Sequence, residues 1–145
     1  MRLAHRVHTA ASPAQVWEVL GDPRRWAEFE LSLRGVRGRP GQVRTGQRLT
    51  GLSRFATLGV PVDVVEAIVP SRLRLLVHVL PGLRELVTFD VAPAVRGGSD
   101  VTVSVVVDGP LGWPAVAPLF LGNVLTVRLL GVRADRIARA ARRAA

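Results

Sequence analysis

The 145-residue sequence contains no cysteine, no lysine and no tyrosine. The absence of cysteine excludes disulfides, thiolate metal sites and a cysteine nucleophile. It is compatible with a reducing compartment, and we expect the protein to be cytoplasmic. Residues 1–20 lack a basic segment followed by an apolar one, so we expect no signal peptide.

The charge of the chain is one-sided. All 20 basic residues are arginine, and the 11 acidic residues leave a net charge of +9. A lysine-free chain rich in Ala, Val, Leu, Gly and Arg is typical of a GC-rich genome. The arginines are spread along the chain, whereas nucleic-acid-binding proteins cluster their basic residues and interleave aromatic ones. We therefore expect no nucleic-acid partner.

Metal-binding and catalytic motifs are also missing. The only histidines are His5, His8 and His78, and no cysteine joins them, so we expect no metal site. His5 and His8 are three apart in a predicted strand and should point to opposite faces, and His78 is expected on the outer face of the sheet. No Ser-His-Asp arrangement, paired-carboxylate motif or phosphate loop occurs, and we expect no cofactor.

Two capped helix starts follow each other near the N-terminus. Ser12, Pro13 and Gln15 form a capping-box pattern, and Gly21 ends that first helix. A second cap and proline begin at once at Asp22, which predicts another short helix. Each helix carries one of the three tryptophans: Trp17 shares a stripe with Val16 and Leu20, and Trp26 shares a face with Phe29.

The middle of the chain alternates between apolar and polar residues, as antiparallel strands do. Proline and glycine turns separate these segments. The predicted strands cover residues 2–9, two short strands within 34–54, and 60–69, 72–80, 84–92 and 100–108. Two of them have an apolar face, made of Leu73, Leu75, Val77 and Val79 in one and Val101, Val103, Val105 and Val107 in the other.

Residues 115–143 have the periodicity of a long amphipathic helix, with Arg128, Asp135, Arg139 and Arg142 on its outer side. Residues 109–127 carry no charge, but their internal prolines and glycines argue against a transmembrane span. The order of elements predicts a single α+β domain over residues 1–145. It would consist of a curved antiparallel sheet of about six or seven strands, two short helices after the first strand, and a long C-terminal helix across the sheet.

On these features the sequence resembles the START-like helix-grip superfamily, also called SRPBCC, of the polyketide cyclase/dehydrase and lipid-transport type. The resemblance spans nearly the whole chain in the right order. The residues that carry it are residues 11–20 (ASPAQVWEVL), Asp22, Trp26, residues 69–73 (VPSRL), residues 89–93 (FDVAP) and residues 97–103 (GGSDVTV). It implies a deep cavity between the sheet, the short helices and the long helix.

The resemblance implies that aromatic and apolar residues line this cavity. Trp17 would anchor the first helix in the core, and Trp26 and Phe29 would lie near the cavity mouth or in the core. The candidate ligand-binding residues are Trp26, Phe29, Leu75, Val77, Phe89, Val103, Trp113, Phe120 and Asn123.

Three polar residues are weak candidates for proton transfer. Glu85 shares a face with Val87, Phe89 and Val91, and a carboxyl buried there would have a raised pKa. We favour the alternative that this face reaches solvent and that Glu85 pairs with an arginine, because unpaired acids are rarely buried. Asp63 lies on a strand whose parity does not decide which face is inside. Asn123 would need a hydrogen-bond partner if buried.

Our leading hypothesis is that the protein binds a small hydrophobic molecule, a lipid or a polyketide-like metabolite, in this cavity, as a monomer or homodimer. The alternative is a polyketide aromatase/cyclase or dehydratase, in which Glu85, Asp63 or Asn123 moves protons. A third hypothesis is a partner-binding subunit that uses the basic face of the terminal helix. Under the leading hypothesis the expected partner is a small hydrophobic molecule.

Overall fold

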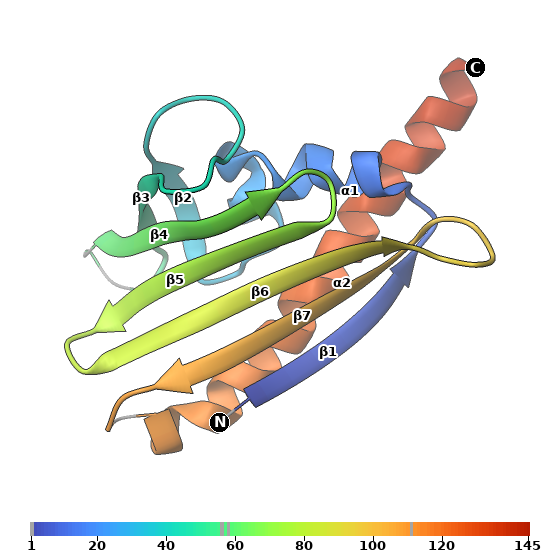
Figure 1. The fold of residues 1–145 in the computed structure, drawn as a ribbon. Helices are drawn as coiled ribbons and strands as arrows, with labels where there is room; N and C mark the ends of the chain where they lie inside the picture. The colour runs from blue at the N-terminus through green and yellow to red at the C-terminus, as the bar shows by residue number, and fades with distance from the viewer. Residues whose placement is uncertain (1, 56, 58, 111) are drawn as a thin grey trace.

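The structure is a computed structural model. It describes the backbone of residues 2–55, 57, 59–110 and 112–145, and their side chains except those of residues 112–121 and 123. Seven antiparallel strands form one sheet in the order β1-β7-β6-β5-β4-β3-β2 (Figure 1). The strands are β1 (Arg2–Thr9), β2 (Leu33–Arg37), β3 (Arg48–Ser53), β4 (Gly59–Ile68), β5 (Arg72–Leu80), β6 (Leu83–Pro93) and β7 (Ser99–Asp108).

One long helix, α2 (Gly112–Ala144), lies across one face of the curved sheet (Figure 1). It packs chiefly against β1, β7 and the short helix α1 (Pro13–Leu20). The predicted α+β helix-grip architecture is therefore confirmed. Among the described residues, none of the helices combines the length and the hydropathy needed to cross a membrane.

The two predicted helix starts between β1 and β2 are both present. The Ser12 hydroxyl accepts from the Gln15 backbone N–H at 3.3 Å, and the Gln15 side chain accepts from the Ser12 N–H at 2.9 Å, which completes the capping box of α1. Asp22 caps the next turn, a 3₁₀ helix η1 (Pro23–Glu28), by accepting from the Arg24 N–H at 3.0 Å.

Packing explains why the residue at the end of α1, Gly21, is a glycine. Its φ is −79°, a conformation open to any residue, but a Cβ at this position would lie 2.4 Å from Nε1 of Trp17. The Trp17 indole lies directly against the Gly21 backbone and is only 2% exposed. Trp17 therefore belongs to the core, where it anchors α1 beneath α2.

The core lies between the inner face of the sheet and the helices. The alternation predicted for β5 and β7 is confirmed, because Leu73, Val101 and Val103 are fully buried. On α2, the small residues Gly131 and Ala134 face the sheet, and a Cβ on Gly131 would lie 3.5 Å from the Val7 side chain. Small residues there allow the helix to approach β1 closely.

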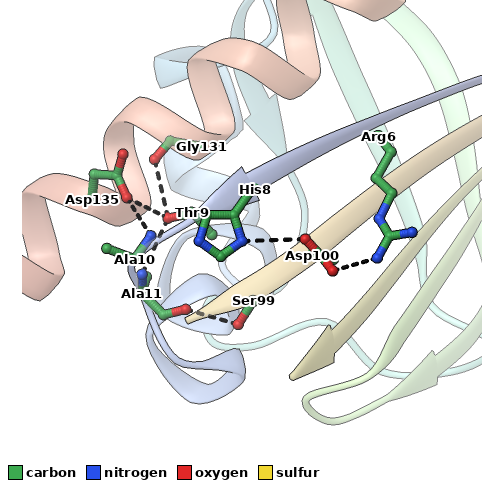
Figure 2. Close-up of polar contacts among 9 residues, drawn as sticks. All are labelled: Arg6, His8, Thr9, Ala10, Ala11, Ser99, Asp100, Gly131 and Asp135. Carbon is green, nitrogen blue, oxygen red and sulfur yellow. Dashed lines mark hydrogen bonds and ion pairs between the residues drawn. The ribbon is translucent and has the colours of Figure 1, made fainter. Parts of the chain in front are cut away.

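A buried polar cluster joins α2 to the end of β1 (Figure 2). The Thr9 hydroxyl donates to Oδ1 of Asp135 at 2.6 Å, and the Ala10 N–H donates to the same oxygen at 2.8 Å. The Ser99 hydroxyl donates to the Ala11 carbonyl at 2.7 Å. On the other face of β1, Arg6 and His8 contact Asp100. This cluster fixes the helix at one place along the sheet edge.

The position of Asp135 corrects the sequence prediction. The helical periodicity placed it on the outer face with Arg128, Arg139 and Arg142, but it is only partly exposed and points at β1. Its carboxylate accepts two hydrogen bonds from Thr9 and Ala10, which lie 126 and 125 residues earlier in the chain. A helical wheel cannot detect a tertiary partner of this kind.

Replacement of Asp135 should destabilise the protein. Asp135→Ala leaves the Ala10 N–H without its acceptor and the buried Thr9 hydroxyl with only the Gly131 carbonyl, at 3.5 Å. We therefore expect a loss of about 1–3 kcal/mol in the free energy of unfolding. Urea denaturation measures this loss. Arg136→Ala, an exposed site on the same helix, is the matched control and should cost well under that amount. Equal effects of the two substitutions would contradict the anchoring role.

Candidate ligand-binding site

A cavity of about 510 Å³ lies between the inner face of the sheet, the segment that follows η1, and α2. Strands β3 to β7 form its floor, and the described part of α2 contributes its roof. Its volume is within the range of ligand pockets in proteins. The lining residues are Leu20, Trp26, Phe29, Glu30, Leu31, Ser32, Leu33, Gly51, Ser53, Phe55, Val60, Val62, Leu75, Val77, Val79, Glu85, Val87, Phe89, Val105, Gly122, Leu125 and Thr126.

Aromatic residues form one wall of this cavity. The rings of Phe29 and Phe89 meet edge to face, with centroids 6.4 Å apart and an interplanar angle of 81°. Trp26 lies beside them, and its indole N–H donates to the Leu20 carbonyl at 2.8 Å. Because that donor is satisfied, the ring offers a ligand only its apolar surface.

The mouth of the cavity is also apolar. Phe55, in the segment between β3 and β4, is 81% exposed, and Leu31 and Leu125 are each 46% exposed, yet all three line the cavity. Large apolar side chains held in solvent around an opening favour the entry of an apolar molecule.

Glu85 is a buried acid that points into the cavity. It is 9% exposed, and its Oε1 atom has no hydrogen-bond partner among the described residues. Its cross-strand neighbours, Val77 on β5 and Val107 on β7, are apolar. Burial, with a smaller contribution from the nearby Glu30 carboxylate, raises the pKa of Glu85 to about 7. Glu85 therefore changes charge near neutral pH.

This finding overturns the environment that we favoured for Glu85 from the sequence. The face does not open to solvent at this residue, and no arginine among the described residues forms an ion pair with it. The general scarcity of buried acids argued for exposure, but the cavity supplies an unusual place in which an acid is removed from bulk water without a protein partner.

Glu30 is a second carboxyl in the lining, and it is firmly held. Its Oε1 accepts from the Ser32 hydroxyl at 2.7 Å and from the Ser32 N–H at 3.1 Å. Its Oε2 accepts from the Thr126 hydroxyl on α2 at 2.7 Å. Three donors fix and stabilise this carboxylate, whereas Glu85 lacks a partner for Oε1. The cavity thus contains two acids in different environments.

Asp63 lies on the opposite face of the sheet. It accepts from Arg48 at 2.7 Å and contacts Nε2 of His78 at 2.9 Å. The Arg48 hydrogen bond, followed by that of His78, lowers the pKa of the Asp63 carboxyl. His78 lies on the outer face, as its parity predicted. Asp63 therefore stays ionised and away from the cavity.

Strand β4 contains a bulge, which the alternation of residues in the sequence could not predict. The register with β5 shifts between Val64 and Glu66. Val62 and Val64 face the core before the bulge, and Ala67 packs against the core after it. Asp63 and Ala67 consequently lie on different faces, although their sequence spacing suggests one.

The structure brings together five of the nine candidate ligand-binding residues in the lining. A sixth, Val103, is fully buried in the core and does not line the cavity. The side chains of Trp113, Phe120 and Asn123 lie outside the described residues. The five lining residues are Trp26, Phe29, Leu75, Val77 and Phe89.

Sequence reasoning missed two kinds of lining residue. Val87 and Val105 share the parity of Phe89 and Val103, so alternation already indicated their face. Glu30 and Thr126 gave no local signal, because one follows a 3₁₀ helix and the other is a lone hydroxyl in a long helix. Their hydrogen bond joins residues separated by 96 positions.

No group of three or more His, Cys, Asp or Glu side chains suited to a metal ion occurs among the described residues. Among the described lining residues, the acidic ones are Glu30 and Glu85, and no histidine is present. The chemistry available there is hydrogen bonding and proton transfer by carboxyl groups, within apolar walls.

Comparison with known proteins identifies relatives of the whole chain. The family model for "Polyketide cyclase / dehydrase and lipid transport" matches residues 1–143. No curated protein sequence matches this chain significantly.

Solved structures from several bacteria are similar to it. A protein from Rhodobacter sphaeroides is 25% identical, with a TM-score of 0.69 and coverage of 96% of this chain and 92% of its own. A hypothetical protein from Helicobacter pylori is 13% identical, with a TM-score of 0.74 and coverage of 92% and 88%. A protein from Thermobifida fusca is 17% identical, with a TM-score of 0.72 and coverage of 94% of both chains. The latter two, at these identities, share the fold.

The raised pKa of Glu85 predicts a pH dependence of stability. Because its folded-state pKa, about 7, lies above the ordinary value of 4.5, the folded protein holds this proton more tightly than the unfolded chain does. The stabilisation is complete below about pH 4.5 and is lost as the pH rises to about 7, a change on the order of 3 kcal/mol.

Urea denaturation of the wild type and of Glu85→Gln across this pH range measures the effect. The difference in unfolding free energy between the two proteins should move in favour of the variant as the pH rises. Glu66→Gln, on the outer face near Arg74, is the matched control and should keep the wild-type pH dependence. A constant difference between wild type and Glu85→Gln would contradict the raised pKa.

Proposed function

We propose that this chain, which belongs to the polyketide cyclase / dehydrase and lipid transport family, binds a small hydrophobic molecule in the cavity between the sheet and α2. Family membership supports hydrophobic ligand binding in general. The observation that carries the proposal for this chain is the cavity of about 510 Å³ with aromatic and aliphatic walls and an apolar mouth. Lipids and polyketide-like metabolites are the ligand classes of this size and polarity.

The energetics of such a site follow from its walls. Transfer of a ligand from water into the cavity stabilises the complex by about 0.8 kcal/mol for each buried methylene group. The edge-to-face pair of Phe29 and Phe89 and the satisfied indole of Trp26 make a fixed surface, so little side-chain freedom is lost on binding. The polar groups of the lining then orient the ligand rather than supply its affinity.

An enzyme of the aromatase/cyclase or dehydratase type is the second candidate function, and Glu85 favours it. A buried carboxyl whose pKa is about 7 can act as an acid or a base at neutral pH. Glu30, held in place by Ser32 and Thr126, lies in the same cavity. In this function the apolar walls fold the reactive chain and exclude water.

Other properties stay predictions. We place the protein in the cytoplasm, consistent with its lack of cysteine, and expect a monomer or a homodimer without a nucleic-acid partner. Use of the basic face of α2 as a docking surface for another subunit has no support beyond the exposed arginines Arg128, Arg139 and Arg142.

Filling the cavity should abolish binding. Val87 lies in the lining and Thr88, the next residue of β6, points to the other face. Val87→Trp places an indole in the cavity, and we expect at least about a tenfold loss of affinity for decanol, since tenfold corresponds to about 1.4 kcal/mol. Isothermal titration calorimetry measures the affinity.

Thr88→Trp is the matched control for this experiment and should bind decanol as the wild type does. Circular dichroism confirms that both variants fold. If Val87→Trp folds and binds decanol unchanged, ligands do not occupy this cavity and the proposed function is wrong.

The second candidate is tested by turnover. A linear poly-β-keto thioester incubated with the protein should cyclise or dehydrate faster than in buffer, and Glu85→Gln should lose about a hundredfold or more of the rate if the carboxyl transfers a proton. Products are followed by mass spectrometry and ultraviolet absorbance. A rate equal in the wild type and Glu85→Gln would exclude Glu85 as the acid or base.

A further inference from the structure

The cavity differs in charge from the rest of the protein. The chain has 20 arginines and a net charge of +9. Among the described residues that line the cavity, however, the only ionisable groups are Glu30 and Glu85. The side chains of residues 111–121 and 123 are not described, and the sequence gives none of them a charged group. The interior is therefore acidic inside a basic protein.

One carboxyl oxygen of these two acids has no hydrogen-bond donor among the described residues. Glu30 already accepts from Ser32 and Thr126. Glu85 has a buried Oε1 without a partner and is 9% exposed. A buried oxygen without a hydrogen bond costs about 1–3 kcal/mol, so a ligand that donates a hydrogen bond at this point recovers that energy.

We propose that the cavity selects apolar molecules with an amine head group over apolar carboxylates such as fatty acids, with the ammonium donating to Glu85 beside Glu30. This inference rests on the proposed function, because it names the chemistry of the ligand that the same cavity takes. An ammonium carries three N–H donors and no acceptor, and the ionised form of the Glu85 carboxyl offers acceptors alone. A carboxylate would meet two further carboxyl groups and no cationic side chain among the described lining residues.

The charge balance of the complex is favourable only for a cation. Removal of an ion from water is costly unless it is paired and hydrogen-bonded, and the cavity offers a free carboxyl oxygen in an apolar setting. The ligand's alkyl part lies against Phe29, Phe89 and the valines of β5 to β7, and its head group lies at the buried acid. One end of the ligand thus supplies affinity and the other supplies selectivity.

The proton balance gives an independent signature. Free Glu85 has a pKa of about 7 and is largely protonated at about pH 6. An ammonium that binds there favours the carboxylate, and the carboxyl proton leaves to solvent. Among the described residues, the neighbours of Glu85 are Val77 on β5, Val107 on β7 and the Glu30 carboxyl after η1, and Glu30 is the one ionisable side chain of the three.

Three probes of equal chain length test the proposal: decylamine, decanol and decanoate. Each is titrated calorimetrically, the two ionic probes below their micellar concentrations and decanol below its solubility limit. We expect decylamine to bind about tenfold or more tighter than decanol, because a hydrogen bond to a charged group contributes about 1.5–3 kcal/mol. Decanoate should bind more weakly than decanol. The positive net charge would favour decanoate at the surface, so surface attraction cannot produce the expected order.

Two variants test whether Glu85 causes the preference for the amine. Glu85→Gln should bind decylamine and decanol with affinities within about a factor of three of each other, and should release no proton when decylamine binds at about pH 6. Proton release is read from titrations in buffers of different ionisation enthalpy. Glu66→Gln, a carboxyl on the outer face, should keep both the wild-type preference and the proton release.

The outcomes separate this inference from the proposed function. If decanol binds but decylamine binds no tighter, or if Glu85→Gln keeps the amine preference, the selectivity is wrong and the apolar site stands. If none of the three probes binds, the proposed function itself fails. An amine preference that disappears only in Glu85→Gln supports the inference.

Discussion

A single helix cannot cover a seven-stranded sheet, and the cavity is the consequence. Seven strands about 4.8 Å apart span roughly 30 Å, whereas a helix with its side chains is about 10 Å wide. Helix α2 is fixed to one side of the sheet by Gly131, Ala134 and the hydrogen bonds between Asp135 and Thr9. The remaining inner face must be covered by η1 and the segment after it, and these cover it without filling it. The packing that fixes α2 at one edge of the sheet therefore also leaves the space beneath the other part of the helix.

Within that space, position determines the chemistry of two similar carboxyl groups. Glu30 is held by donors from its own segment and from α2, so it links the cover of the cavity to the helix. Glu85 lies on β6 between Val77 and Val107 of the neighbouring strands, and its Oε1 atom has no donor among the described residues. Burial raises the pKa of Glu85 to about 7, so below neutral pH the carboxyl is mostly uncharged and costs less to bury. Under the proposed function, a ligand that donates a hydrogen bond to Glu85 would remove this cost, and the apolar walls and the acid would then act as one recognition site.

Local signals in the sequence predicted nearly all of the fold. Caps at Ser12 and Asp22 and alternation in β5 to β7 depend on neighbours in the chain, and the structure agrees with them. The residues of the site were harder to predict from the sequence. Alternation indicates a face but not the distance to the covering helix, so it ranked Val103 with Leu75 although only Leu75 reaches the cavity. The positions of Glu30 and Asp135 and the environment of Glu85 are set by contacts between distant segments. The bulge in β4 separates Asp63 from Ala67, which their spacing in the sequence placed on one face.

Native mass spectrometry of the purified protein tests the central claim most directly, because it detects a ligand without requiring its identity in advance. The account predicts one small apolar molecule per chain, released on denaturation, or, from an emptied protein, uptake of one molecule of decanol per chain. Extraction then identifies the head group, which the acidic interior predicts to be a donor. A protein that is isolated empty and takes up no apolar probe would contradict the account, because the cavity would then be closed to ligands in solution.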